Sequence, residues 1–357
     1  MPSLTWASAK SDNAGGAQRY EEAIQAALLA VADPSDWTFK RAQLTGLRTP
    51  GRGGRRVPMG LLDRASLSTA RALGRLAYPR GLVHRFDLRL PPAGLREVAT
   101  VHGLEPWHFT DEGLLPPWLE PATRESFGCI AVSEFTASEL RSRLDIKRIW
   151  VIPNGVDESW RSVTSLSAEE RAGLGLQESY VLHAAGASAR KNLPPLAAAW
   201  PEVHSRTQAQ LVMTGSPDPR RTALFEGLPG AKLLGRVDYE LLQRIMAGAA
   251  VVVVPSLYEG FGLPAIEAMA CGVPVVASSR AALPEVCGEA AVLVDPDAVG
   301  LVNGLLTVLE NPELARRLRV AGRERATAFS WTASAKSHLK AYQELSGAVP
   351  DRGASCD

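Results

Sequence analysis

The stretch from Pro255 to Pro274 constrains the fold of this chain more than any other part of the sequence. An apolar, valine-rich run at residues 249–254 precedes it and indicates a buried parallel strand. The loop Glu259-Gly-Phe-Gly-Leu263 contains two glycines, and the proline that follows it opens an expected helix. The order of strand, glycine loop and helix is typical of α/β proteins, in which the backbone N–H groups at the helix start favour an anion.

Two carboxylates bracket this loop. Glu259 lies in the loop, and Glu267 follows eight positions later, about one turn into the expected helix. Both side chains can then face one ligand. A phosphate-bearing ligand with hydroxyl groups would suit this arrangement of helix-start N–H groups and carboxylates. The alternative is a plain strand-to-helix turn with two surface glutamates.

Length and charge limit the class of protein. At 357 residues the chain is expected to hold two domains. A net charge of +1 argues against nucleic acid as a partner. Residues 1–100 nevertheless contain 15 Lys and Arg against 8 Asp and Glu. This basic excess predicts contact with an anionic lipid surface or a phosphorylated substrate, or else is an arginine-rich solvated face.

The four cysteines are widely spaced and form no CxxC pair, so neither a disulfide framework nor a zinc site is expected, and a reducing compartment fits. The N-terminus lacks a secretory signal pattern, and no apolar run is long enough to span a bilayer. The sequence therefore predicts a cytoplasmic protein. Any contact with the membrane is expected to be peripheral and at its inner face.

The first half of the chain is expected to alternate strands and helices. A strand at 4–8 leads through Gly15 and Gly16 to a helix at 17–30. The glycine pair is not a GxGxxG motif, and it predicts either ligand binding at the carboxyl end of the first strand or a tight turn. Residues 45–60 form an arginine-rich loop. Further elements are expected at 37–44, 61–77, 81–86, 97–102, 129–133, 136–144 and 148–153.

His102 is a candidate catalytic residue. It ends an expected strand and Gly103 follows it, so its imidazole should lie at the carboxyl end of the sheet, where ligands bind in open α/β folds. The alternative is a structural histidine.

The second half repeats the alternation after a polar linker expected at 158–178. Together the halves predict two doubly wound domains facing a central cleft. The expected domains are 1–157 and 179–330, and a last helix at 331–346 is expected to pack back on the first domain. The elements expected in the second half lie at 180–186, 193–204, 210–214, 231–234, 238–248, 249–254, 264–270, 273–277, 290–295, 297–309 and 312–328.

Arg190 and Lys191 follow the first strand of the second half. Adjacent cations in such a loop suit a diphosphate, because the guanidinium can bind two oxygens and the ammonium adds a point charge. Fixed cations also stabilise the charge that develops on a diphosphate leaving group. Two ordinary surface cations are the alternative. The loop after strand 210–214 offers Asp218 without a second carboxylate beside it, so no catalytic metal is expected.

These motifs resemble the retaining glycosyltransferases of family 4, which have the GT-B fold. The resemblance extends over essentially the whole chain and is closest to bacterial mannosyltransferase-like members that build surface polysaccharides. The stretches that carry it are Val132-Ser-Glu-Phe135, Pro153-Asn-Gly-Val-Asp157, Arg190-Lys-Asn192, Glu259-Gly-Phe-Gly-Leu-Pro-Ala-Ile-Glu267, Leu283-Pro-Glu-Val286 and Leu293-Val-Asp-Pro296.

The resemblance implies roles on the donor side. Glu267 would hold the ribose hydroxyls, and Arg190 with Lys191 would bind the diphosphate. Glu259 would hold the transferred sugar. The backbone around this glutamate would contribute Gly260, Phe261, Gly262 and Leu263, and the base would meet Gly235, Arg236 and Val237.

On the acceptor side, the resemblance implies that Gly15 and Gly16 line the phosphate and acceptor region, together with the loop at 45–60. His102 matches a family histidine near the reacting centre. Many relatives have Asp after this histidine, whereas Gly103 stands here. The resemblance therefore does not imply how the imidazole of His102 is oriented or which role it has.

The predicted function is therefore a metal-independent, retaining transfer of a hexose from a nucleotide diphosphate sugar to a glycan or lipid-linked acceptor. GDP-mannose is the favoured donor, followed by UDP-glucose or a UDP-N-acetylhexosamine, and no cofactor is expected. The alternatives are a nucleotide-sugar epimerase or phosphorylase of the same fold, or a non-catalytic GT-B partner subunit.

Overall fold

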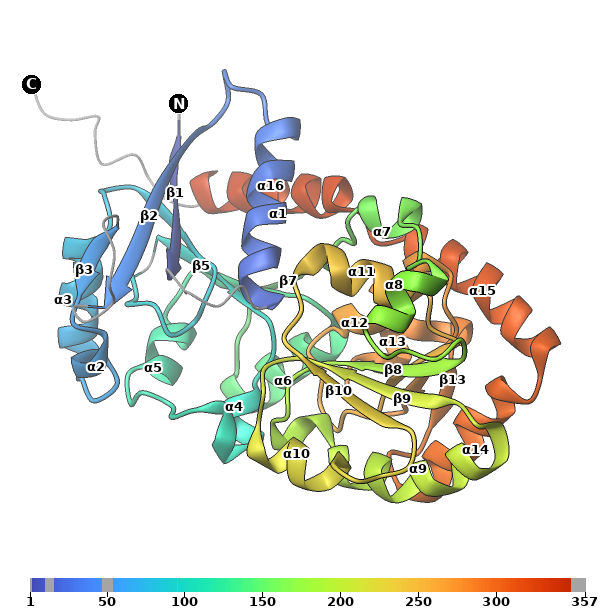
Figure 1. Cartoon of the computed structure of the whole chain (residues 1–357). Coiled ribbons are helices and arrows are strands. Elements are labelled where there is room, and N and C mark those ends of the chain that lie inside the picture. The colour runs from blue at the N-terminus through green and yellow to red at the C-terminus, as the bar shows by residue number, and fades with distance from the viewer. Residues whose placement is uncertain (1, 10–15, 47–53, 95, 348–357) are drawn as a thin grey trace, which may run out of the picture. The chain divides into compact units, whose positions relative to one another are not determined.

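The computed structural model describes residues 2–9, 16–46, 54–94 and 96–347. The chain divides into two compact units, each built on its own parallel sheet (Figure 1). Unit 1 comprises the described parts of Met1–Gly155 and Trp331–Asp357, and unit 2 is Val156–Ser330. The last helix therefore belongs to the same unit as the N-terminal half of the chain.

In unit 1 the described residues form a seven-stranded sheet in the order β3-β2-β1-β4-β5-β6-β7, and every neighbouring pair is parallel. The order reverses between β1 and β4, which is the doubly wound arrangement. The strands are β1 (Ser3–Ala9), β2 (Thr38–Gly46), β3 (Arg55–Val57), β4 (Leu82–Arg85), β5 (Glu97–Val101), β6 (Gly128–Ala131) and β7 (Ile149–Val151). The helices are α1 (Gly16–Val31), α2 (Met59–Leu62), α3 (Leu67–Ala77), α4 (Glu105–His108), η1 (Thr110–Glu112), α5 (Leu119–Arg124), α6 (Glu134–Leu144) and α16 (Trp331–Gly347).

Helix α16 completes the core of unit 1 and lies beside α1 (Figure 1). Its Tyr342 is buried in the same apolar cluster as Trp6 and Tyr20. Buried polar contacts fix the helix as well: His84 Nδ1 lies 2.6 Å from the Tyr342 hydroxyl, and the Tyr20 hydroxyl lies 3.0 Å from Nε2 of His338. Because buried polar groups need partners, these contacts specify one seating for α16.

Unit 2 contains a six-stranded parallel sheet in the order β10-β9-β8-β11-β12-β13. Its order reverses between β8 and β11. The strands are β8 (Tyr180–Ala184), β9 (Gln210–Thr214), β10 (Ala231–Gly235), β11 (Val251–Val254), β12 (Val275–Ser278) and β13 (Val292–Val294). The helices are α7 (Ser159–Ser162), α8 (Ala168–Gly173), η2 (Ala189–Lys191), α9 (Leu193–Thr207), α10 (Pro219–Phe225), α11 (Tyr239–Ala247), α12 (Leu263–Cys271), α13 (Leu283–Cys287), η3 (Gly288–Ala290), α14 (Ala298–Leu309) and α15 (Pro312–Thr327).

The core of unit 2 explains its strand pattern. The four valines of β11 are buried, as expected for a central parallel strand covered on both faces. Helices α9 and α14 lie on one side of the sheet (Figure 1), and Trp200 and Leu305 pack there in one cluster with Val251 and Val253.

Three expectations about the chain need correction. The residues expected as a linker, 158–178, belong to unit 2 and form α7 and α8, and Trp160 in α7 is buried. The helix expected at 61–77 is two helices, because Ser66 accepts a hydrogen bond from the Thr69 N–H and caps a new helix, α3. The arginine-rich stretch 45–60 includes the end of β2, all of β3 and the start of α2, and its residues 47–53 lie outside the described part.

Candidate functional site

The candidate site lies where the sheet of unit 2 changes direction. The strands β8 and β11 are neighbours and parallel. From β8 the chain continues to β9 on one side of this pair, and from β11 it continues to β12 on the other side. In doubly wound sheets ligands bind at the carboxyl ends of such a strand pair. The loop after β8 carries Arg190 and Lys191, and the loop after β11 carries Glu259.

Asn192 joins these two loops. Its backbone has φ 57, in the left-handed region, and its side-chain amide donates to the carbonyl oxygens of Pro255 at 3.0 Å and Pro296 at 2.7 Å. The N–H of Leu257 donates to the Arg190 carbonyl at 2.8 Å. Contacts within the protein therefore fix the two loops against each other.

The carboxylate of Glu259 lies between both cations. Lys191 Nζ is 2.6 Å from Oε1, and Arg190 donates to Oε2 at 3.0 Å. The hydroxyl of Ser256 donates to Oε1 at 2.7 Å, and an Arg190 nitrogen donates to the Tyr258 carbonyl at 3.2 Å. The structure thus brings together three of the residues that the sequence proposed. We call Arg190, Lys191, Ser256 and Glu259 the ion cluster.

Glu259 stays ionised in this setting. Only 7% of the residue is exposed, and burial by itself raises the pKa of its carboxyl. Lys191 and Arg190, with hydrogen bonds from Lys191 and Ser256, outweigh burial and lower the pKa to about 2. With two cations and one carboxylate, the ion cluster keeps one net positive charge and can attract an anion.

Glu267 lies in α12, just over one turn from its start. Gly262 precedes the helix with φ 102, in a region that residues with a side chain rarely adopt, so this position favours glycine. Glu267 is 6% exposed. Burial and this nearby carboxylate both raise the pKa of Tyr239, so Glu267 lies near α11.

The residues expected to meet the base lie at the end of β10. Gly235 ends the strand with φ 71, and its carbonyl accepts from the Gly215 N–H at 2.9 Å. Arg236 is exposed and Val237 is half-buried. The following helix begins with Tyr239, whose hydroxyl accepts from Trp160 Nε1 at 2.7 Å and donates to Asp157 at 2.9 Å.

His102 follows β5 in unit 1. Its ring is half-buried and packs edge to face against Tyr20, with ring centroids 4.6 Å apart. Burial lowers the pKa of His102 to about 4, although the carboxylate of Asp87 and a hydrogen bond with the Phe86 backbone act in the opposite direction. The imidazole is therefore neutral near pH 7, and its Nε2 is buried with no hydrogen-bond partner among the described residues.

The remaining acceptor-side residues are placed only in part. Gly16 is the first residue of α1, and Gly15 lies outside the described residues. A Cβ at Gly103 would lie 2.7 Å from the carboxylate of Glu105, a flexible group. Asp87 supplies His102 with a carboxylate neighbour from the loop after β4.

Sequence reasoning missed Ser256, Asp87 and Tyr239. Ser256 had a weak signal, since it stands three residues before Glu259 in a loop that must turn. Asp87 and Tyr239 had none, because their partners lie on other strands and helices. Asp218, weighed above as a lone acidic residue, caps α10 by accepting from the Arg220 N–H at 2.8 Å.

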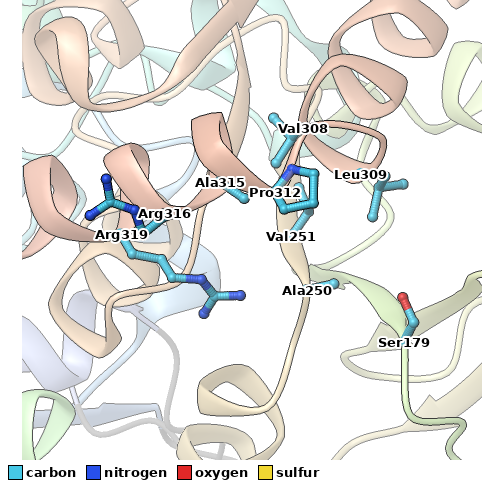
Figure 2. A pocket seen from close by; sticks show the side chains of 9 residues that line it. All are labelled: Ser179, Ala250, Val251, Val308, Leu309, Pro312, Ala315, Arg316 and Arg319. Carbon is cyan, nitrogen blue, oxygen red and sulfur yellow. The ribbon is translucent and has the colours of Figure 1, made fainter.

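A hollow of about 310 Å³ lies at the amino-terminal ends of the strands of the same sheet (Figure 2). Ser179 and Ala250, which line it, precede β8 and β11, whereas the ion cluster follows these strands. The hollow is therefore separate from the candidate site.

A parallel doubly wound sheet with two cations, one of them buried, at its switch point is typical of nucleotide-binding α/β enzymes. Comparison with known proteins narrows this class. Residues 178–311 match the family described as "Glycosyl transferases group 1", and residues 69–160 match "Glycosyltransferase Family 4". The chain is 30% identical to alpha-maltose-1-phosphate synthase of Mycolicibacterium smegmatis over 298 residues, 71% of this chain and 74% of the relative. The chain belongs to glycosyltransferase family 4.

A second curated relative is O-antigen chain mannosyltransferase B of Escherichia coli, 32% identical over 177 residues. That match covers 47% of this chain and 46% of the relative, so the chain spans about half the length of that protein.

Solved structures share the fold. Sucrose-phosphate synthase from Thermosynechococcus elongatus superposes with a TM-score of 0.73 at 25% identity, over 98% of this chain and all of that one. Anabaena Alr3699/HepE in complex with UDP and glucose gives a TM-score of 0.71 at 18% identity, over 96% of this chain and 100% of that chain. The expected GT-B fold is confirmed.

Proposed function

We propose that this chain transfers a hexose, with mannose favoured, from a nucleotide diphosphate sugar to a hydroxyl of a glycan or a lipid-linked acceptor. The observation that carries the proposal is the ion cluster at the switch point of unit 2, where Glu259 holds Lys191 by a buried contact and Arg190 by a partly buried one. Retention of configuration follows from the family resemblance.

The donor side follows from charge and position. Two fixed cations can stabilise a diphosphate that gains charge as the bond to the sugar breaks, without help from a metal. Glu267, buried one helix turn from Gly262, suits the ribose hydroxyls. The preference for mannose rests on the relative named O-antigen chain mannosyltransferase B. Because HepE was solved in complex with UDP, UDP-sugars are also tested as donors.

A panel of donors tests the proposal directly. The purified chain is mixed with GDP-mannose, UDP-glucose or UDP-N-acetylglucosamine, and its melting temperature is measured, because a ligand that binds only the folded state stabilises it. We expect one donor to raise the melting temperature. Transfer of the sugar from that donor should continue in excess chelator, and NMR should show that the product is the α-anomer. Stabilisation by none of the donors would contradict the proposal.

Glu267→Gln separates donor binding from folding. The neutral amide has one acceptor oxygen and one donor nitrogen, so it cannot accept a hydroxyl at each of its two ends as a carboxylate can, and donor stabilisation should be lost while the chain remains folded. Glu310→Gln is the matched control, because Glu310 belongs to an exposed pair with Arg206 in the same unit. Equal donor binding by both variants would contradict the role given to Glu267.

We further propose that the protein works in the cytoplasm, against the inner face of the membrane. No helix among the described residues is long and apolar enough to cross a bilayer. Leu61 and Leu76 are 71% and 76% exposed, and exposed arginines stand near them in the sequence, at 56, 64, 75 and 80. Sedimentation with vesicles of anionic and of neutral lipid tests this: binding only to the anionic vesicles is expected, and equal binding to both would contradict it.

A further inference from the structure

Glu259 contacts the two cations that a diphosphate would need. Its Oε1 accepts from Lys191 at 2.6 Å and from Ser256 at 2.7 Å, and its Oε2 accepts from Arg190 at 3.0 Å. The side chains of Lys191 and Glu259 are each 9% exposed, so the pair is poorly screened by solvent. A phosphate bound to the same cations would therefore feel the charge of Glu259 strongly.

We propose that Glu259 is a counter-charge that weakens the hold of Arg190 and Lys191 on a nucleoside diphosphate, and weakens it more for the free diphosphate than for the sugar-bearing donor. This inference rests on the proposed transfer reaction. It assigns Glu259 a role in releasing product, in addition to the sugar contact that the family resemblance implies.

The difference between donor and product follows from the chemistry of transfer. The bond from the anomeric carbon to the phosphate oxygen breaks, and its electron pair stays on the phosphate. The acceptor oxygen bonds to the anomeric carbon, and its proton is released to solvent, directly or through the phosphate. The nucleoside diphosphate then carries about one more negative charge than the donor's diphosphate did. Repulsion from Glu259 increases with that charge, so the product is bound less tightly than it would be by the cations alone.

The same geometry links the two parts of the donor. Lys191, Ser256 and Arg190 use three of the about four acceptor positions of the Glu259 carboxylate. Phosphate oxygens that take over the donors of Lys191 and Arg190 leave more of these positions for hydroxyls of the sugar. The sugar contact is therefore favoured when the diphosphate is in place.

Nucleotide binding to Glu259→Gln tests the inference. The amide has nearly the same size and no charge. GDP and UDP are each titrated by calorimetry into the unaltered chain and into this variant. We expect whichever nucleotide binds to bind the variant about tenfold more tightly, since nearby charges commonly change affinity by this amount or more. The gain for the corresponding nucleotide sugar should be smaller, and turnover should fall because product release slows.

Two comparisons isolate the effect. Glu170→Gln removes a carboxylate of the same unit that pairs with Arg244 on the surface, so it changes net charge equally and should leave nucleotide affinity unchanged. If Glu259→Gln does not fold, the double variant Lys191→Met/Glu259→Gln is compared with Lys191→Met alone. The double variant should bind the nucleotide more tightly, because Arg190 is then released from the carboxylate.

The outcomes separate this inference from the proposed function. Nucleotide binding that Glu259→Gln leaves unchanged or weakens overturns the counter-charge alone. If neither GDP nor UDP binds the unaltered chain or any variant, the proposed function fails and this inference fails with it. An affinity gain as large in Glu170→Gln as in Glu259→Gln also overturns it, since the effect would then come from net charge.

Discussion

Each unit of the molecule contains a buried ion pair, and the two pairs differ in what surrounds them. In unit 1 the side chains of Arg85 and Glu97 are 0% exposed and 2.9 Å apart. Nη1 of Arg85 donates to the carbonyls of Leu88 and Leu90, Nε is buried without a hydrogen-bond partner among the described residues, and the second carboxylate oxygen of Glu97 accepts from the Ala93 N–H. Both charged groups are fully buried and contact only protein groups. The pair therefore holds the loop after β4 and cannot exchange partners with a ligand.

In unit 2 the pair of Lys191 with Glu259 lies at the carboxyl edge of the sheet. Arg190 beside it keeps 18% of its side chain exposed. A ligand at this edge can replace one partner of the ion pair by another. The pair of Arg85 with Glu97, which we call the sealed pair, cannot exchange partners in this way. The comparison shows that burial of an ion pair does not by itself indicate function. Its position relative to the switch point of the sheet and its residual access to solvent do.

The largest effect on stability should come from breaking the sealed pair. Glu97→Gln leaves the guanidinium of Arg85 buried without a counter-charge, which typically costs about 3–5 kcal/mol. Urea unfolding followed by circular dichroism should show this loss. The double variant Arg85→Met/Glu97→Met should be less destabilised than the single one, because no charge remains buried. Equal stability of Glu97→Gln and the unaltered chain would contradict the sealed-pair interpretation.

The exchangeable pair should behave in the opposite way. Lys191→Met leaves Glu259 paired with Arg190 and Ser256, so we expect a loss of about 1 kcal/mol in unfolding free energy. Transfer should fall about 100-fold or more, because a fixed cation at the leaving group is lost. Arg206→Gln, on an exposed pair in the same unit, is the control for both measurements. A large stability loss with transfer retained would reverse the contrast between the two pairs.

Sequence patterns predicted every strand of both units except β3, because runs such as Val251–Val254 are apolar over the length of a strand and flanked by turn residues, whereas β3 is three residues long and mostly arginine. They also marked the residues of the ion cluster. They did not predict that Glu259 contacts both cations, since this depends on the register of β8 against β11, which no local pattern encodes. The linker was misjudged because α7 and α8 are short and mostly polar, and the burial of Trp160 depends on distant partners such as Tyr239.

Buried histidines should make both units respond to acid in the same way. Burial, and then the neighbouring His338, His102 and Arg85, lower the pKa of His84 well below its usual value, and burial lowers the pKa of His338 to about 4. The unfolded chain binds these protons at about pH 6.5, before the folded chain does, so stability is present above that pH and is lost as the pH falls toward 4. Each such histidine should cost about 1.4 kcal/mol per pH unit in this range.

Urea unfolding between pH 7 and pH 5 measures this slope. Removing one titrating group with His338→Gln should reduce it by about 1.4 kcal/mol per pH unit. In unit 2, burial followed by Lys191 and Arg221 lowers the pKa of His183 to about 3, so His183→Gln should reduce the slope as well. The ion cluster itself contributes little above pH 4.5, because Glu259 is ionised in both states there. A slope unchanged by His338→Gln would show that this ring does not titrate as described.

The smallest expected effect concerns the carboxylate beside His102. Asp87 raises the pKa of this imidazole against the larger, opposite effect of burial, and it stands on the loop that the sealed pair of unit 1 holds. Asp87→Asn should therefore lower the pKa of His102 from about 4 by less than about one unit, as followed by NMR of the ring proton. Because the imidazole is neutral near pH 7 with or without Asp87, the transfer rate at that pH should change by less than about threefold. Glu105→Gln, on the neighbouring carboxylate that faces Gly103, is the comparison, and no effect of this residue on the pKa of His102 is expected. If Asp87→Asn raised the pKa, or if transfer were lost with the pKa unmoved, the aspartate would act on His102 by something other than its charge.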